Sequence, residues 1–176
     1  MSSPKDLVFD ASGNAYLLNL GATPGTGSVY KYNSSGVYQS TILSSLNYAL
    51  GLAIDNSDNL YVADQGAVTV KKYSTSGTLL LSLPTANLST PLGVAVDASG
   101  NIYVLNNGSG NVTKYNSAGT FQSTFLSGFT SAQSITIDGA GNLYIGDDPA
   151  TNIVRVYNPS GTLLTSKAIN LSLIHI

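Results

Sequence analysis

The 176-residue sequence contains no cysteine, no tryptophan and no glutamate. Without cysteine, the chain can form neither a disulfide framework nor a thiolate metal site. All nine acidic residues are aspartates. Aspartate favours turns and caps because its short carboxylate accepts hydrogen bonds from nearby backbone amides, whereas glutamate favours helix interiors. Acidic residues that are all aspartate, with no glutamate, therefore indicate an all-β chain.

Charge is also scarce: charged residues make up 9% of the chain and the net charge is −2. A phosphate backbone would find no basic field here, so we do not expect nucleic acid as a partner. The sequence has no run of about 18 apolar residues and no signal-peptide pattern after Met1, so we expect no membrane segment. Low charge with abundant Ser, Thr, Asn and Gly favours an exported or cell-surface bacterial protein.

The chain does contain a phrase of five residues that begins with Asp and ends with Asn, and it occurs four times. Successive copies begin 45, 42 and 41 positions apart. A short apolar run precedes each copy, and a tyrosine follows two residues after each Asn. The copies are 10–14, 55–59, 97–101 and 138–142.

The repeated tyrosine lies in a second strand. Two further strands follow it, the first ending in Lys-Tyr or Val-Tyr, with a glycine-containing turn between them. Four strands per unit at this period are the signature of a β-propeller blade. We therefore predict a partial propeller over residues 1–170, with blades at about 3–46, 47–88, 89–129 and 130–170.

The pattern resembles the NHL repeat most closely in the third unit, where Pro-Leu-Gly-Val-Ala-Val-Asp precedes Gly-Asn-Ile-Tyr-Val. The first unit departs by a longer loop over 19–28. NHL repeats usually close a six-bladed ring, which at this period needs about 250 residues. The resemblance implies that the four visible blades form an open arc of a six-bladed propeller. Such an arc would expose apolar blade faces and self-associate.

Residues 171–176, Leu-Ser-Leu-Ile-His-Ile, resemble the translation of a transposase adaptor. We expect them to be a non-native tail, the alternative being a natural apolar terminus. On the first interpretation His175, the single histidine, carries no weight in the assignment of function.

The repeated turns predict a scaffold role. The aspartates should cap the turns through their carboxylates, and the glycines should supply a positive φ. The Asp55 stretch superficially resembles a calcium loop but lacks the glycine and distal glutamate of an EF-hand, so we assign no metal. The structural turn residues are Asp10, Gly13, Asp55, Asp97, Gly100, Asp138 and Gly141.

The loops on the opposite side of the blades vary in length and chemistry, and binding groups concentrate in such loops. A carboxylate just past a strand could instead cap loop amides, so both interpretations stay open for Asp64 and Asp147. The repeated tyrosines are predicted to be core, and the lysines and the arginine of the third strands to be solvated or snorkelling. The candidate ligand-binding residues are Asn19, Tyr48, Asp64, Asn106, Asp147 and Asp148.

The resemblance extends to gluconolactonase-like hydrolases, streptogramin lyases and peptide-amidating lyases, and implies a metal at the channel mouth of such enzymes. The visible blades supply no glutamate and no usable histidine, so we assign no catalytic residue, and a divalent cation would depend on further blades. The sequence favours a scaffold that binds a protein, a glycan or a small molecule. The alternative is part of a metal-dependent propeller hydrolase or lyase, gluconolactonase-like or streptogramin-lyase-like, whose catalytic residues lie mainly in missing blades.

Overall fold

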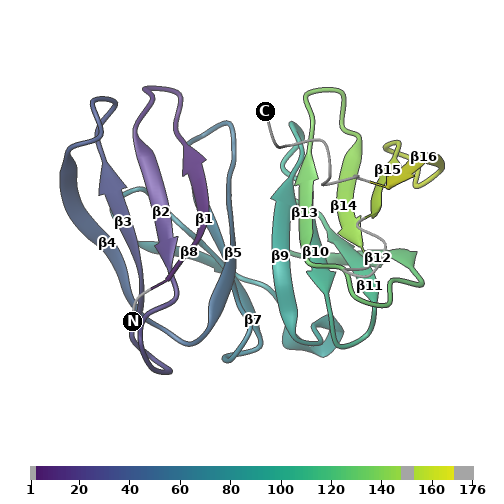
Figure 1. Ribbon diagram of the computed structural model, residues 1–176, viewed down its shortest axis with the longest axis horizontal. Helices are drawn as coiled ribbons and strands as arrows, with labels where there is room; N and C mark the ends of the chain where they lie inside the picture. The colour runs from purple at the N-terminus through teal and green to yellow at the C-terminus, as the bar shows by residue number, and fades with distance from the viewer. Residues whose placement is uncertain (1–2, 148–152, 169–176) are drawn as a thin grey trace.

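The computed structural model describes residues 3–147 and 153–168. Sixteen strands form four antiparallel sheets of four strands each (Figure 1). We call the sheets the first to fourth blades, in chain order. The strands are β1 (Pro4–Phe9), β2 (Ala15–Asn19), β3 (Gly27–Tyr32), β4 (Tyr38–Leu46), β5 (Ala49–Ile54), β6 (Leu60–Asp64), β7 (Thr69–Tyr73), β8 (Leu79–Ser82), β9 (Pro91–Val96), β10 (Ile102–Asn106), β11 (Asn111–Tyr115), β12 (Phe121–Ser127), β13 (Ser134–Ile137), β14 (Leu143–Asp147), β15 (Ile153–Tyr157) and β16 (Leu163–Ala168).

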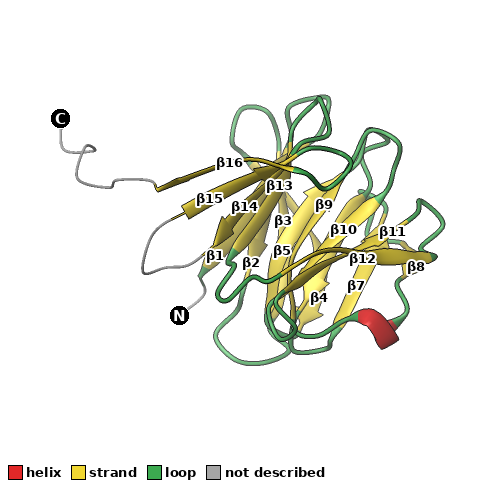
Figure 2. Ribbon diagram, turned by 90° about the vertical axis from the view of Figure 1, so that its right-hand side faces the viewer, coloured by secondary structure: helices red, strands yellow, loops and turns green. Residues whose placement is uncertain are grey.

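Each blade is a simple meander, because every strand pairs with the next one along the chain. The one helical element of the described residues is the short 3-10 turn η1 (Thr85–Asn87), red in Figure 2. Among the described residues, no helix has the length and apolar character that crossing a bilayer would require. The all-β prediction and the four four-stranded blades are confirmed.

The first strands of the blades, β1, β5, β9 and β13, lie together in the middle of the molecule (Figure 1) and line a common channel. The core lies between blades, in one cluster for each of the three blade interfaces. In the cluster between the first two blades, Tyr16 and Leu18 pack with Leu52 and Leu60. This packing explains why both faces of the inner strands are apolar.

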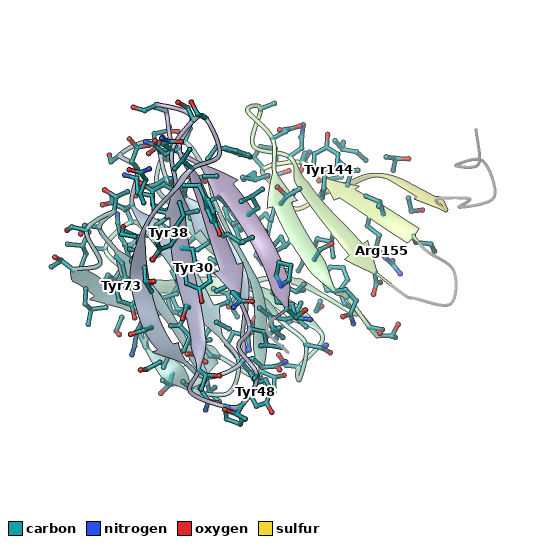
Figure 3. The ribbon with its side chains drawn as sticks, turned by 60° about the vertical axis from the view of Figure 1, so that its left-hand side comes forward. Tyr30, Tyr38, Tyr48, Tyr73, Tyr144 and Arg155 are labelled. Atoms are coloured by element: carbon teal, nitrogen blue, oxygen red, sulfur yellow. The ribbon has the colours of Figure 1, made fainter. Side chains whose placement is uncertain are left out.

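Within the described part of the chain, no blade covers the two outermost faces of the arc. On the first blade Leu7 is 46% and Phe9 59% exposed, whereas Leu52, at the position of Leu7 in the second blade, is 4% exposed. Tyr30 and Tyr38 lie on this first blade in Figure 3, with ring centroids 6.1 Å apart. The arc is therefore open, and the predicted count of six blades is not confirmed.

Candidate functional site

The turns joining β1 to β2 and β3 to β4 lie at one end of the blade (Figure 1), and those of the other blades match them. The first turn of every blade contains the same hydrogen-bond network. In the third blade Asp97 accepts bonds from the backbone N–H groups of Ser99 and Asn101, both at 2.9 Å. Its other oxygen accepts from Asn101 Nδ2 at 2.8 Å and from the Tyr103 hydroxyl at 3.2 Å. We call this end the turn face; it comprises 10–14, 33–37, 55–59, 74–78, 97–101, 116–120, 138–142 and 158–162.

The turn backbone also matches the turn chemistry. Gly13, Gly100 and Gly141 have φ of 78°, 79° and 83°. Asp58 takes the same place in the second blade with φ of 61°. Aspartate tolerates this left-handed conformation better than most side chains. The turn face is therefore a repeated structural unit.

A lysine on the third strand lies over the tyrosine of this network in three blades, and in the second blade it also pairs with the aspartate. Lys72 Nζ lies 2.9 Å from Asp55 Oδ2 and 5.1 Å from the centre of the Tyr61 ring. Lys31 and Lys114 lie over Tyr16 and Tyr103 in the same way, at 5.3 and 5.1 Å. The prediction of solvated lysines missed this cation–π contact, although the repeated pairing of Tyr and Lys was its signal.

The ion pair perturbs Asp55. Burial acts to raise the pKa of its carboxyl, but hydrogen bonds from Lys72, Asn59 and Ser57 outweigh burial and lower the pKa from 3.8 to about 2. Burial also raises the pKa of the Tyr61 hydroxyl. The Asp55 carboxylate, the Lys72 ammonium and the Tyr61 hydroxyl bind one another, so we assign this network a structural role.

At the opposite end, the loops between second and third strands bond to the loops between blades. Gln65 donates its backbone N–H to Tyr48 at 3.2 Å, and Gly108 donates to Ser89 at 3.1 Å. We call this end the loop face; its described loops are 20–26, 47–48, 65–68, 83–90, 107–110 and 128–133.

Three of the predicted ligand-binding residues tie these loops together. Asp64 accepts hydrogen bonds from the backbone N–H groups of Asn47, at 2.9 Å, and Ala67, at 3.2 Å. In the third blade Asn106 Oδ1 accepts a hydrogen bond from the Ser89 N–H at 3.0 Å. In the fourth blade Asp147 Oδ1 accepts one from the Ser131 N–H at 3.4 Å. The contacts favour the capping interpretation, and ligand binding by these residues stays a prediction.

The remaining candidates differ in exposure. Asn19 is buried at the end of β2. Tyr48 is 44% exposed and lies at the loop end of the molecule in Figure 3. Asp148 lies outside the described residues, as do His175 and the expected tail 171–176.

The loop face also carries strained backbone. Tyr48, Val68 and Thr90 have φ of 57°, 50° and 46°. Such a φ is unfavourable for a side chain with a Cβ, most of all for the β-branched Val68 and Thr90. Strain of this kind persists where the surrounding structure imposes it, and it clusters at binding sites. On the turn face, by contrast, the residues with positive φ are glycines and Asp58.

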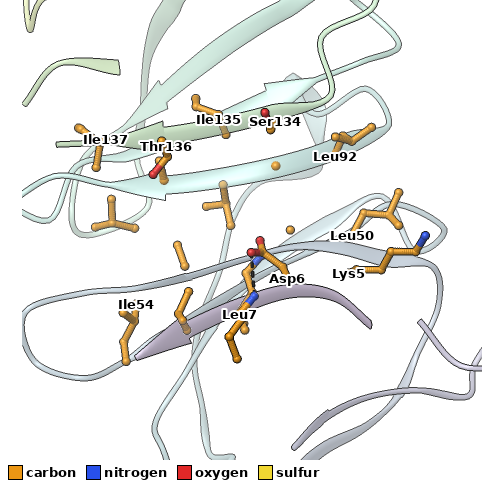
Figure 4. Close-up of a pocket in the computed structure, with 18 of the residues that line it drawn as sticks. Lys5, Asp6, Leu7, Leu50, Ile54, Leu92, Ser134, Ile135, Thr136 and Ile137 are labelled. Atoms are coloured by element: carbon orange, nitrogen blue, oxygen red, sulfur yellow. Dashed lines mark hydrogen bonds between the residues drawn. The ribbon is translucent and has the colours of Figure 1, made fainter. Parts of the chain in front are cut away.

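The central channel has a volume of about 480 Å³ (Figure 4). Asp6 lies in its wall and accepts backbone N–H bonds from Leu52 at 2.8 Å and Leu7 at 2.9 Å. Burial raises the pKa of this carboxyl, and the two bonds offset part of the effect. Sequence reasoning missed Asp6, although Gly51 and Gly93 stand at its position in the next two blades.

Among the described residues, no three His, Cys, Asp or Glu side chains gather in a group able to hold a metal ion. The channel wall offers one carboxylate, and that carboxylate already binds two backbone amides. The described part of the site can therefore position a polar ligand through hydrogen bonds, and it shows no assembled catalytic group.

The comparisons with known proteins agree with this architecture. The sequence model of the NHL repeat matches residues 88–115. No protein of curated function matches the chain. Among solved structures, the chain is similar to a gluconolactonase from Xanthomonas campestris, with a TM-score of 0.67 and 23% identity over 84% of this chain and 55% of that one.

It is similar to a streptogramin B lyase, with a TM-score of 0.70 and 15% identity over 95% of this chain and 55% of that one. It also resembles a protein of unknown function from Bacteroides caccae, with a TM-score of 0.70 and 13% identity over 96% and 62% of the two chains. The chain thus spans between 55% and 62% of the length of these three structures. The predicted NHL repeat and β-propeller fold are confirmed, and identities this low show the fold alone.

Proposed function

We propose that the chain is part of a propeller that binds a glycan, another small polar ligand or a protein on its loop face. The observation that supports this proposal is the contrast between the two faces. The turn face repeats one self-satisfied network, whereas the loop face varies and carries strained residues with an exposed tyrosine. Loops held by a rigid scaffold are where proteins place their binding groups.

A second candidate function is part of a metal-dependent hydrolase or lyase, favoured by the likeness to a gluconolactonase and a streptogramin lyase. It predicts that a longer protein, in which further blades complete the metal site, hydrolyses glucono-lactone faster than calcium or zinc ions alone do. A rate equal to that of the metal alone favours the binding function for these blades.

The binding function is tested by calorimetric titration with a panel of methyl glycosides and short oligosaccharides. We expect Tyr48→Asn to weaken the binding of the best ligand by about fivefold, because an aromatic contact is lost while asparagine tolerates the positive φ. The matched control is Ser35→Ala on the turn face, which should bind as the wild type does. Equal losses in both variants, or a loss in Ser35→Ala alone, would contradict a loop-face site.

A further inference from the structure

A second cavity, of about 240 Å³, lies between the first and second blades beside the loop face. The end of β4 forms one wall, and β6 and β7 form the other. Its polar lining includes Ser44, Asn47, Asp64, Thr69, Lys71 and Tyr73.

The cavity corresponds to space that loop side chains occupy in the other two interfaces. The loop 83–90 brings Leu83 and Leu88 into the core cluster that contains Tyr115. The loop 128–133 places Phe129 against Tyr157, with ring centroids 6.2 Å apart. In both interfaces the last tyrosine of the third strand is buried.

Tyr73 holds the same position in the second blade, but it is only half-buried. The loop from β4 to β5 consists of residues 47–48 alone, and neither of its side chains joins the core cluster of that interface. Tyr48 points to solvent, with 44% of its surface exposed. The short loop therefore leaves one face of Tyr73 to the cavity.

One polar pair of the cavity lacks the direct contact that joins its counterparts in the third and fourth blades. In the third blade Asn106 Nδ2 donates to Thr113 Oγ1 at 3.0 Å, and in the fourth Asp147 Oδ2 lies 2.9 Å from Arg155 Nε. The corresponding pair in the second blade is Asp64 and Lys71, and within the described part of the chain no ion pair joins them.

Asn47 Oδ1 is a third polar group of the cavity wall. It is buried without a hydrogen-bond partner among the described residues. Buried polar atoms are almost always paired with protein, water or ligand, so such an atom in a cavity wall indicates a missing partner. Burial and the negative charge of Asp64 raise the pKa of the Tyr73 hydroxyl, which therefore stays a neutral donor at physiological pH.

We propose that this cavity is a binding subsite for a monosaccharide-sized polyol. One carboxylate and one ammonium together favour a ligand without net charge, and hydroxyl groups can donate to Asp64 while they accept from Lys71. The Tyr73 ring offers an apolar surface to the carbon skeleton of the ligand. The volume of about 240 Å³ is below the range of roughly 300 to 1,000 Å³ for drug-sized sites and suits a smaller ligand.

This inference rests on the proposed binding function and narrows it to one subsite, so its test uses the same titrations with methyl glycosides. Lys71→Met removes the ammonium and keeps the stem, and Ser44→Leu fills the cavity without touching either charge. We expect each variant to weaken glycoside binding tenfold or more. Lys71→Met loses a charge-assisted hydrogen bond, and Ser44→Leu occupies the space that the ligand needs. Lys5→Met, in the channel wall, is the matched control and should bind like the wild type.

The outcomes separate the two proposals. Unchanged binding in Lys71→Met and Ser44→Leu, with a loss in Tyr48→Asn, overturns the subsite and leaves the loop-face function standing. A loss in Lys5→Met alone moves the ligand to the channel and also overturns the subsite. Binding of glycine or alanine in place of any glycoside overturns the polyol assignment, because a zwitterion would then pair with Asp64 and Lys71. If no saccharide and no amino acid binds, the subsite is overturned. If no protein binds the chain either, the proposed binding function of the loop face is overturned as well.

Discussion

At the scale of single residues, one aspartate organises the first turn of each blade. Its two oxygens accept two backbone N–H groups, an asparagine amide and a tyrosine hydroxyl, and in the second blade a lysine as well. Hydrogen bonds to a charged acceptor are stronger than neutral ones. The tyrosine is thereby fixed at the blade interface, where its ring is buried in the first three blades.

Asp55 should make the stability of the chain depend on acidic pH. Its pKa lies at about 2 in the folded protein, below the ordinary 3.8. Folding therefore favours the carboxylate, and this contribution is complete above pH 3.8 and declines as the pH falls toward about 2. Urea unfolding followed by circular dichroism across this range should show the decline in the wild type.

The Asp55→Asn variant should be less stable at neutral pH and should lose less on acidification, because it has no carboxyl to protonate at this position. Parallel curves for the two proteins between pH 4 and pH 2 would show that the pKa of Asp55 is not lowered as described.

At the scale of elements, the close approach of the inner strands depends on glycine. A Cβ at Gly51 would lie 2.8 Å from Gly93 Cα and 2.8 Å from the Leu92 carbonyl oxygen. Both are backbone atoms of the next blade, and they cannot move without separating β5 from β9. Gly139 lies in the first turn of the fourth blade, and no neighbouring atom lies within 4 Å of a Cβ placed there.

We predict that Gly51→Ala lowers the free energy of unfolding by about 1 to 3 kcal/mol, the usual cost of overpacking. Gly139→Ala is the matched control and should change it by less than about 1 kcal/mol. Chemical denaturation of both variants measures the difference. Equal values would mean that β5 and β9 do not touch at Gly51.

The turns could be predicted from sequence because their chemistry is local: Asp97 and Asn101 bond to each other within one turn. The position of Lys72 over Tyr61 depends on the register of β6 with β7, which places the two residues opposite each other. The cavity beside Tyr73 exists because the first blade leaves space unfilled there. The hydrogen bond of Asp6 to Leu52 depends on how closely β1 approaches β5. Sequence periodicity carries no information on the cavity, and for Asp6 it shows only that glycine stands at the same position in the next two blades.

At the scale of the whole molecule, the outer face of the first blade repeats the chemistry of faces that other blades cover. Leu7 and Phe9 correspond to Leu52 and Ile54, which pack against the first blade. At the other end Tyr144 corresponds to Tyr103 but is only half-buried. Apolar surface of this kind tends to associate.

We therefore expect the purified chain to associate as its concentration rises, as sedimentation velocity can show. Substituting Phe9→Ser and Leu7→Ser together should shift the distribution toward monomer, since it removes apolar area from the open face. Val37→Ser, an exposed change in a turn of the same blade, is the control. A wild type that stays monomeric at all concentrations would contradict this expectation.

The central claim is that the loop face binds and the turn face supports. Backbone amide chemical shifts of the wild-type chain, recorded by NMR during titration with the best methyl glycoside, test it most directly. We predict shifts at residues 44–48 and 64–71, around the cavity between the first two blades, with the turns at 10–14 and 55–59 unchanged. Shifts confined to those turns would contradict the claim, and no shift with any glycoside or oligosaccharide would overturn the subsite between the first two blades.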